Sequence, residues 1–260
     1  RVRWTVAWAV LVALLVALAS GLVASAAVAV TQISSDPYTN STSQHKTQVE
    51  PDTFAFGSTI VAAQQTGRFY DGGSSNILWS TSTNNGASWT TGGLPGITKI
   101  VSAGNPYDRV SDPSVAYDAK HNTWLISSLA ITTSGSSVKG AAVIVNRSTD
   151  GGATWSNPVT VKAATGSANL DKNWTVCDNT AASPYYGNCY TEWDDNGAGN
   201  RIYMSTSKDG GVTWGTAAQP SGRPAGLGGQ PVVQPNGTVI VPYTNGNQIG
   251  AFSSTNGGGR

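Results

Sequence analysis

The chain has 260 residues, of which 39% are apolar and 11% charged, and its formal net charge is +1. Soluble globular proteins carry about 25% charged residues, so ionic groups are scarce here. Without a basic block there is no electrostatic footprint for a nucleic-acid backbone, and a nucleic-acid partner is excluded. The 31 glycines, and the lack of long amphipathic helical patterns after residue 30, predict an all-β protein with many turns.

The first 30 residues form a separate segment, predicted to be a signal peptide or a membrane anchor. Two arginines in RVRW precede an almost wholly apolar run. Small residues offer cleavage sites at residues 24–26 and 27–29, as in a secretory signal. Residues 6–30 also exceed the roughly 18 apolar residues that span a bilayer. In both cases the rest of the chain is secreted or lies at the cell surface, with membrane association through residues 6–30 if the segment is kept. Residues 31–47 are polar and aperiodic, which predicts a flexible linker.

Two repeated phrases organise the remainder. One nine-residue phrase begins at Ser82, Ser148 and Ser207, at intervals of about 60 residues. The other, an acidic or amide residue before an apolar strand, recurs at Glu50, Asp112, Asp171 and Gln230. Each unit contains about four short apolar or alternating segments, which is the pattern of a β-propeller blade. We therefore predict a propeller over residues 48–260, with blades at about 48–108, 109–168, 169–227 and 228–260.

Three blades and the start of a fourth do not close a ring, since propellers have about 4–8 blades. An open blade exposes a strand edge that pairs with other chains. We expect the protein to continue beyond Arg260; a misfolded or oligomeric chain is the alternative.

Cys177 and Cys189 flank a stretch with Asn, Ser-Pro and Gly turn signals. If NWTVC and CYTEW are antiparallel strands, the two cysteines are directly opposed at a Cα distance of about 4.5–5.5 Å, which a disulfide tolerates. Such a short loop would contribute about 3 kcal/mol to stability. Two free thiols in the core are the alternative.

The nine-residue phrase suits a tight hairpin between the third and fourth strands of a blade. Its acidic or amide side chain can accept backbone hydrogen bonds, its glycines permit positive φ, and its tryptophan can be buried against a neighbouring blade. A residue that recurs in every unit belongs to the scaffold, whereas a catalytic group is needed once. We assign these structural roles to Asn84, Trp89, Asp150, Trp155, Asp209 and Trp214.

This phrase resembles the Asp-box, or BNR repeat, of the sialidase superfamily, and the resemblance extends from about residue 48 to the end. It implies a six-bladed propeller with the boxes on the face away from the active site. It also implies a site in the central funnel, where three arginines hold a sugar carboxylate, an aspartate acts as acid/base, and a glutamate polarises a tyrosine nucleophile. The box also occurs in propellers that are not sialidases.

The chain departs from that pattern at the blade openings, because Glu50, Asp112 and Asp171 stand where an arginine would be expected. Facing the funnel, these carboxylates would repel an anionic substrate. Three roles remain open for them: contact with a neutral sugar, binding of a cation, and capping of strand starts by backbone hydrogen bonds.

Two further places are candidates for chemistry. Asp71, in the stretch GRFYDGG, lies where the resemblance implies the acid/base loop, and it could donate a proton if burial raised its pKa. The alternative is a turn residue. Arg68 could bind an acidic group or pair with Asp71. Glu192 could be the partner glutamate, although a solvated strand face is the simpler reading.

These observations predict an exported, carbohydrate-active propeller that acts on a glycan or glycoconjugate as an exo-glycosidase, with sialic acid cleavage as its sharpest form. The alternative is a non-catalytic propeller that binds glycans or proteins for adhesion or assembly. We expect no cofactor and no metal site, since neither histidine lies in a metal-ligating pattern.

Overall fold

The computed structural model describes residues 30–258, and the features below lie in the compact unit Ile33–Arg260. The predicted N-terminal signal or anchor helix lies outside the described residues. Among residues 30–258, no helix has the length and apolar character needed to cross a membrane.

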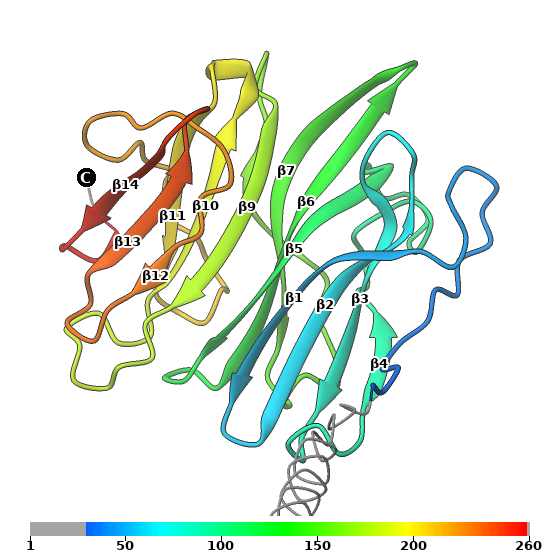
Figure 1. Ribbon diagram of the computed structural model, residues 1–260, viewed down its shortest axis with the longest axis horizontal. Coiled ribbons are helices and arrows are strands. Elements are labelled where there is room, and N and C mark those ends of the chain that lie inside the picture. The colour runs from blue at the N-terminus through cyan, green and yellow to red at the C-terminus, as the bar shows by residue number, and fades with distance from the viewer. Residues whose placement is uncertain (1–29, 259–260) are drawn as a thin grey trace, which may run out of the picture. The chain divides into compact units, whose positions relative to one another are not determined.

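Four successive groups of antiparallel strands make up this unit (Figure 1). Blade 1 contains β1 (Gln48–Phe56), β2 (Thr59–Arg68), β3 (Ser74–Ser82) and β4 (Thr90–Gly93). Blade 2 contains β5 (Arg109–Asp118), β6 (Thr123–Ser134), β7 (Ser137–Ser148) and β8 (Val159–Ala163). Blade 3 contains β9 (Leu170–Cys177), β10 (Cys189–Asp195), the short 3₁₀ helix η1 (Asn196–Ala198) and β11 (Arg201–Ser207). Blade 4 contains β12 (Val232–Val233), β13 (Val239–Thr244) and β14 (Ile249–Ser254).

Blades 1 and 2 have the four strands expected from the sequence, and a bridge between Ser74 and Val110 joins them into one hydrogen-bonded network. In blade 3 the fourth strand is reduced to two isolated bridges to β11, Met204 with Ala218 and Arg201 with Ala225. This weak outer strand agrees with the weak apolar segment that follows Trp214.

The first strands of the blades lie next to one another. β5 contacts both β1 and β9, and β9 contacts β12. Two hydrogen bonds tie the strands together: the Val115 amide donates to Asp52 Oδ2 at 2.6 Å, and the Thr175 amide donates to Ser114 Oγ at 3.0 Å. The first strands therefore line the axis of the propeller.

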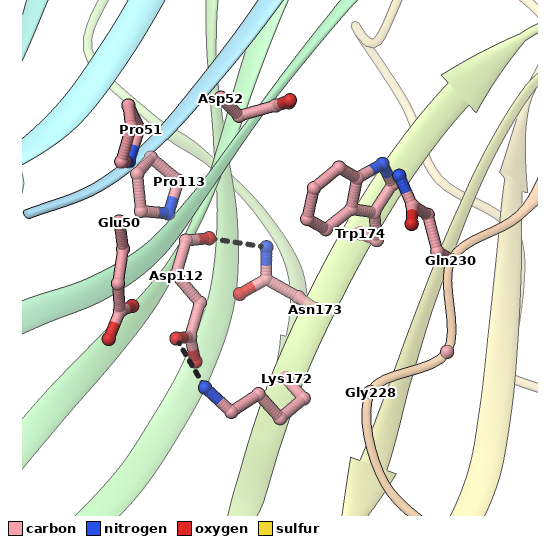
Figure 2. A pocket seen from close by; sticks show the side chains of 11 residues that line it. Glu50, Pro51, Asp52, Asp112, Pro113, Lys172, Asn173, Trp174, Gly228 and Gln230 are labelled. Atoms are coloured by element: carbon pink, nitrogen blue, oxygen red, sulfur yellow. Dashed lines mark hydrogen bonds and ion pairs between the residues drawn. The ribbon is translucent and has the colours of Figure 1, made fainter. Parts of the chain in front are cut away.

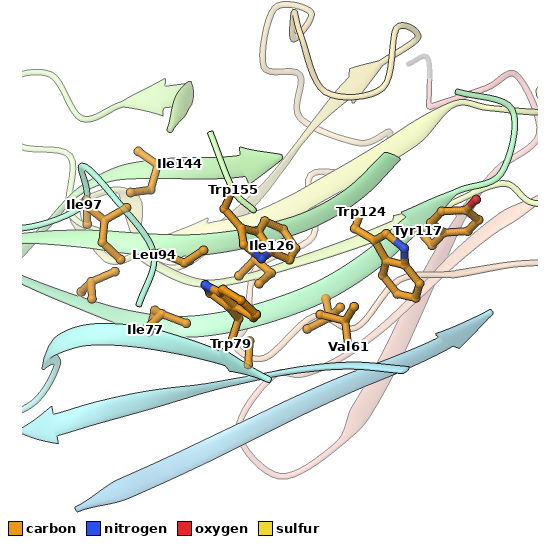
Figure 3. Close-up of a cluster of buried hydrophobic side chains, with 14 of the residues drawn as sticks. Val61, Ile77, Trp79, Leu94, Ile97, Tyr117, Trp124, Ile126, Ile144 and Trp155 are labelled. Atoms are coloured by element: carbon orange, nitrogen blue, oxygen red, sulfur yellow. The ribbon is translucent and has the colours of Figure 1, made fainter. Parts of the chain in front are cut away.

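The repeated box supports the contact between blades. Trp155 is buried beside Trp79 of blade 1, with ring centroids 6.4 Å apart, in a core that also contains Val61, Ile77 and Ile144 (Figure 3). The hydroxyl of Thr81 donates to the carbonyl of Gly152 at 2.9 Å. The predicted burial of the box tryptophan against the neighbouring blade is confirmed for Trp155.

The disulfide prediction is also confirmed. Cys177 and Cys189 are directly opposed in the register of β9 and β10, and they are disulfide-bonded.

The prediction of a flexible linker is wrong for residues 33–47, because this segment packs on blade 1. The side chain of Asn76 donates to Tyr38 Oη at 2.6 Å, and Ser75 Oγ donates to Asn40 Oδ1 at 3.1 Å. Asp36 accepts from the Thr47 amide at 3.1 Å. Composition missed this, because the partners are polar groups that only the folded blade presents.

Candidate functional site

The site is built by one backbone irregularity that recurs in every blade. Near its start, the first strand carries an extra residue relative to its partner, so the pairing shifts between Val49 and Asp52 and again between Ser111 and Ser114. The bulged residues have φ values of 51° at Glu50, 47° at Asp112 and 49° at Lys172. Positive φ is uncommon for residues with a side chain. A bulge re-aims its side chain away from the regular ladder.

The four bulges converge on one cavity of about 360 Å³ (Figure 2). Its lining is Glu50, Pro51, Asp52, Asp112, Pro113, Lys172, Asn173, Trp174, Gly228, Gly229 and Gln230. A second cavity of about 320 Å³ shares Glu50, Asp112 and Lys172 with it, and adds Arg68, Asp71 and Asp171. We call the two together the axial cavity.

In blades 3 and 4, the residues equivalent to Glu50 and Asp112 are not the ones inferred from the sequence. The counterparts of Glu50 and Asp112 are Lys172 and Gly228, which has φ of 65°, and not Asp171 and Gln230. A signal for this was present in the sequence. Buried Asp118 is the last residue of β5 and buried Asp178 directly follows β9, and counting back six residues from each leads to Asp112 and Lys172.

A lysine therefore stands among the carboxylates of the axial cavity. Lys172 Nζ lies 3.2 Å from Asp112 Oδ1, whose side chain is only 9% exposed. Burial raises the pKa of Asp112, the Lys172 ammonium opposes that rise, and nearby Glu50 adds to it. The pKa of Lys172 is raised chiefly by the Asp112 carboxylate. This ion pair with a lysine is not one of the three roles considered above for the carboxylates at the blade openings.

Asp171 remains at the site, one residue before the bulge, and it lines the second cavity. It accepts from the Lys172 amide at 2.9 Å and from Asn196 Nδ2 at 3.2 Å. Burial raises its pKa, and the charge of Asp112 adds to the effect. It thus combines backbone capping with a position in the cavity.

Behind Asp171 lies Asp194 of β10, which the sequence reasoning missed. The two are paired in register, and both carboxylate oxygens of Asp194 are buried without a hydrogen-bond partner. Burial, with the charges of Asp171 and Asp112, raises the pKa of Asp194 to about 8. Asp194 is therefore a protonated carboxyl group near neutral pH.

The expectation that Glu192 lies on a solvated strand face is wrong. Its side chain is 1% exposed, and neither carboxylate oxygen has a hydrogen-bond partner. Gly229 covers it so closely that a Cβ at this glycine would lie 2.4 Å from the carboxyl carbon. Burial, and then the charge of Asp194, raise the pKa of Glu192 well above its ordinary value. Gly229 lines the first cavity and thus separates Glu192 from it.

Asp71 and Arg68 both line the second cavity, but they are not paired with each other. Asp71 lies in the turn between β2 and β3, where Arg109 Nη1 donates to Asp71 Oδ1 at 2.5 Å and to the Gly72 carbonyl at 2.9 Å. The Arg109 guanidinium also lies 4.3 Å from the ring centre of Phe69. The hydrogen bond from Arg109 lowers the pKa of Asp71, which is the opposite of the shift that a proton donor needs.

Arg68 retains binding capacity. One of its guanidinium nitrogens, Nη1, is buried without a hydrogen-bond partner. Arg68 lines the second cavity, and a guanidinium suits an acceptor group on a ligand.

The box residues lie at the other ends of the strands. The β2–β3 turn with Asp71 is at the cavity end of β3, and the box with Asn84 follows its far end at Ser82. Asp150 Oδ1 accepts from the Ala153 and Thr154 amides, both at 3.0 Å, as a hairpin residue should. Asp209 makes the corresponding bond to the Thr213 amide at 2.9 Å. Within residues 30–258, no group of three or more His, Cys, Asp or Glu side chains is placed to hold a metal ion.

Neither the family models nor the curated proteins match this chain. Solved structures do. The leech intramolecular trans-sialidase, in complex with 2,7-anhydro-Neu5Ac, superposes with a TM-score of 0.64 at 13% identity, over 90% of this chain and 52% of its own. The Hadza microbial sialidase Hz136 matches with a TM-score of 0.59 at 17% identity, over 80% of this chain and 44% of its own. An α-L-arabinanase from Penicillium chrysogenum, in complex with arabinobiose, matches with a TM-score of 0.58 at 15% identity, over 86% of this chain and 66% of its own.

These comparisons establish the fold: the chain has the architecture of sialidase and trans-sialidase propellers, shared with other propeller glycosidases. The resemblance deduced from the boxes is confirmed at that level. The chain spans about half the length of the first two of these structures.

Proposed function

We propose that this chain is part of an exported propeller that binds a neutral glycan in the axial cavity and hydrolyses a glycosidic bond there. The observation that carries the proposal is the convergence of Glu50, Asp112 and Lys172 on one cavity, through bulges repeated in successive blades. Glycoside hydrolysis needs a protonated carboxyl group and a carboxylate. The axial cavity offers both kinds of group, because burial raises the pKa of Asp112 and Asp171 whereas Arg109 lowers the pKa of Asp71.

Asp112 is the candidate proton donor. Its side chain lines both cavities, it is nearly buried, and burial raises its pKa. A raised pKa keeps a carboxyl group protonated at the pH where its proton is needed. Asp71, whose pKa Arg109 lowers, suits the ionised partner or a positioning group better than the acid.

Charge favours a neutral substrate over a sialoside. Glu50, Asp112 and Asp171 line the axial cavity against one lysine, Lys172, which is paired with Asp112, and none of the four bulge positions carries an arginine. The arabinobiose in the related arabinanase is a neutral sugar of this kind. Cleavage of sialosides is the finer proposal, and it requires Arg68 to bind the substrate carboxylate against this local charge.

The test is turnover of fluorogenic arabinofuranosides, galactosides and sialosides by the full-length protein and its variants. Asp112→Asn should lower kcat by about 100-fold or more, as expected for loss of a general acid. Asp209→Asn is the matched control, since it lies in a box at the other end of the strands, and it should stay within about twofold of the parent. Turnover that is unchanged in Asp112→Asn would remove Asp112 from this role.

Asp71→Asn separates catalysis from binding. Loss of turnover with saccharide binding retained would make Asp71 part of the chemistry, and unchanged turnover would remove it. If the parent protein cleaves no glycoside but binds saccharides, the second candidate function applies, a non-catalytic glycan-binding propeller. The Asp71–Arg109 ion pair is the observation that favours that candidate.

Export is proposed from the apolar segment at residues 6–30, and the Cys177–Cys189 disulfide supports it, because disulfides persist in oxidising compartments. Fractionation of cells into medium, membrane and cytoplasm would test this. Recovery of the protein only in the cytoplasm would contradict it.

A further inference from the structure

We propose that the indole of Trp174 is the stacking platform of a sugar-ring subsite between the first strands of blades 3 and 4. The ligand is one ring of a neutral oligosaccharide, and the subsite sets the orientation of the chain in the axial cavity. This inference rests on the proposed function, because it names a binding position inside the same cavity.

Trp174 occupies a position that, in the two preceding blades, accepts a hydrogen bond from the next blade. Asp52 accepts from Val115, and Ser114 accepts from Thr175. Asp52 and Ser114 occupy the same register position, two residues after the bulged residue. The next member of this series is Trp174.

At the junction between blades 3 and 4, neither the accepting nor the donating residue of this hydrogen bond is present. Trp174 has no carboxylate or hydroxyl to accept a bond, and the residue of blade 4 that would donate one is Pro231, which has no amide hydrogen. The link between blades that Asp52 and Ser114 provide is therefore missing at this junction. The cavity of about 360 Å³, which all four blades line, extends to this junction, where Trp174 and Gln230 are part of its lining.

The walls of the cavity suit a sugar ring. Figure 2 shows the indole of Trp174 between Gln230 on one side and Pro113 on the other, with Pro51 beyond. Trp174 is only partly buried, in contrast to the core tryptophans Trp79, Trp124 and Trp193. Ligand sites combine apolar and aromatic walls with a few placed polar groups. The apolar face of a sugar ring fits against an indole, while its hydroxyl groups stay at the edges.

The polar groups at the edge are in place. Asn173 is 2% exposed, and its Nδ2 donates to the Asp112 carbonyl at 3.2 Å and to Ser127 Oγ at 3.0 Å. Its Oδ1 is buried without a donor. A buried acceptor left unpaired is unfavourable, and a sugar hydroxyl could donate to it. Lys172 and Gln230 supply further donors in the same cavity.

The experiment measures saccharide binding by the full-length protein and by Trp174→Ala and Trp174→Phe. The probes are a panel of neutral oligosaccharides that includes arabinobiose, with 3′-sialyllactose as the anionic probe. We expect Trp174→Ala to weaken binding of neutral probes by about 10-fold or more, because it removes the aromatic face against which the ring would pack. Trp174→Phe should retain part of the affinity. Trp89→Phe, in a box at the far end of the strands, is the matched control and should bind as the parent does.

A second measurement separates stacking from a structural effect. Binding should change the tryptophan fluorescence of the parent, and this change should be lost in Trp174→Phe under conditions where that variant is saturated. Unchanged affinity in Trp174→Ala, with or without a lower melting temperature, would overturn the subsite alone and show a packing residue. Binding of 3′-sialyllactose without any neutral probe would overturn the ligand class. Failure of the parent protein to bind any probe would overturn the proposed function and the subsite together.

Discussion

Asp150 shows how one residue of the repeated box stabilises its hairpin. One carboxylate oxygen accepts from Ser148 Oγ at 2.7 Å and from two backbone amides, and the other accepts from Thr154 Oγ1 at 2.5 Å. Hydrogen bonds from Thr154 are the leading reason that the pKa of Asp150 falls to about 2. In the first box, Asn84 makes the equivalent bonds, accepting from the Ser88 amide at 2.9 Å and donating to Ser88 Oγ at 2.8 Å. The role needs an acceptor of this shape, and the charge is not essential.

At the residue scale we therefore predict that Asp150→Ala destabilises the protein by about 1–2 kcal/mol, because it removes several hydrogen bonds from an exposed turn. Asp150→Asn should lose much less, since the chain itself uses asparagine in the first box. Urea unfolding of the two variants measures the difference. Equal losses in both would show that charge, and not shape, is what the hairpin requires.

At the scale of the elements, the first strands of blades 1 and 2 each accept a hydrogen bond from the first strand of the next blade. Ser114 Oγ accepts from the buried Thr175 amide at 3.0 Å. Ser128, also buried, has a hydroxyl with no hydrogen-bond partner. The two serines have the same chemistry and similar burial, so the difference between them isolates the contribution of the link between blades.

We predict that Ser114→Ala lowers the free energy of unfolding by about 1–3 kcal/mol, because the Thr175 amide would be left without an acceptor. Ser128→Ala is the control and should lie within about 0.5 kcal/mol of the parent. Both are measured by urea unfolding. A similar loss in the two variants would indicate general sensitivity of the core and no specific link.

At the scale of the whole molecule, buried acidic groups set how stability depends on pH. The folded state raises the pKa of Asp194 to about 8, from an ordinary value of 3.8, and raises that of Glu192 in the same direction. Between these pH values the folded protein retains a proton that the unfolded chain has lost. Stability from this source is complete below about pH 4 and is lost as the pH rises towards 8.

We therefore predict that the melting temperature falls between pH 5 and pH 8, and that the fall is smaller in Asp194→Asn, which has no proton to lose. Glu192→Gln should act in the same direction. Asp209→Asn is the control, because the pKa of Asp209 is lowered and its ionisation is complete below this range. Thermal unfolding at closely spaced pH values gives the result. An identical fall in Asp194→Asn and the parent would exclude Asp194 as its source.

Much of the architecture was determined by the sequence alone. The box, the spacing of about 60 residues and the alternation within blades depend on local turn chemistry and strand periodicity, which are written along the chain. The opposed cysteines were predictable for the same reason, since a short hairpin places its strands in register. These features require no knowledge of distant contacts.

The composition of the site was decided by the tertiary structure. Bulges shift register by one residue, so Lys172, not Asp171, became the partner of Asp112, and a cation entered a site expected to be anionic. Glu192 and Asp194 lie on a strand whose pattern does not reveal that blade 4 covers it, through Gly229. Arg109 binds Asp71 from the neighbouring blade, at a separation of 38 residues. Burial and pairing across blades depend on how the sheets pack, and that packing is absent from any single segment of the sequence.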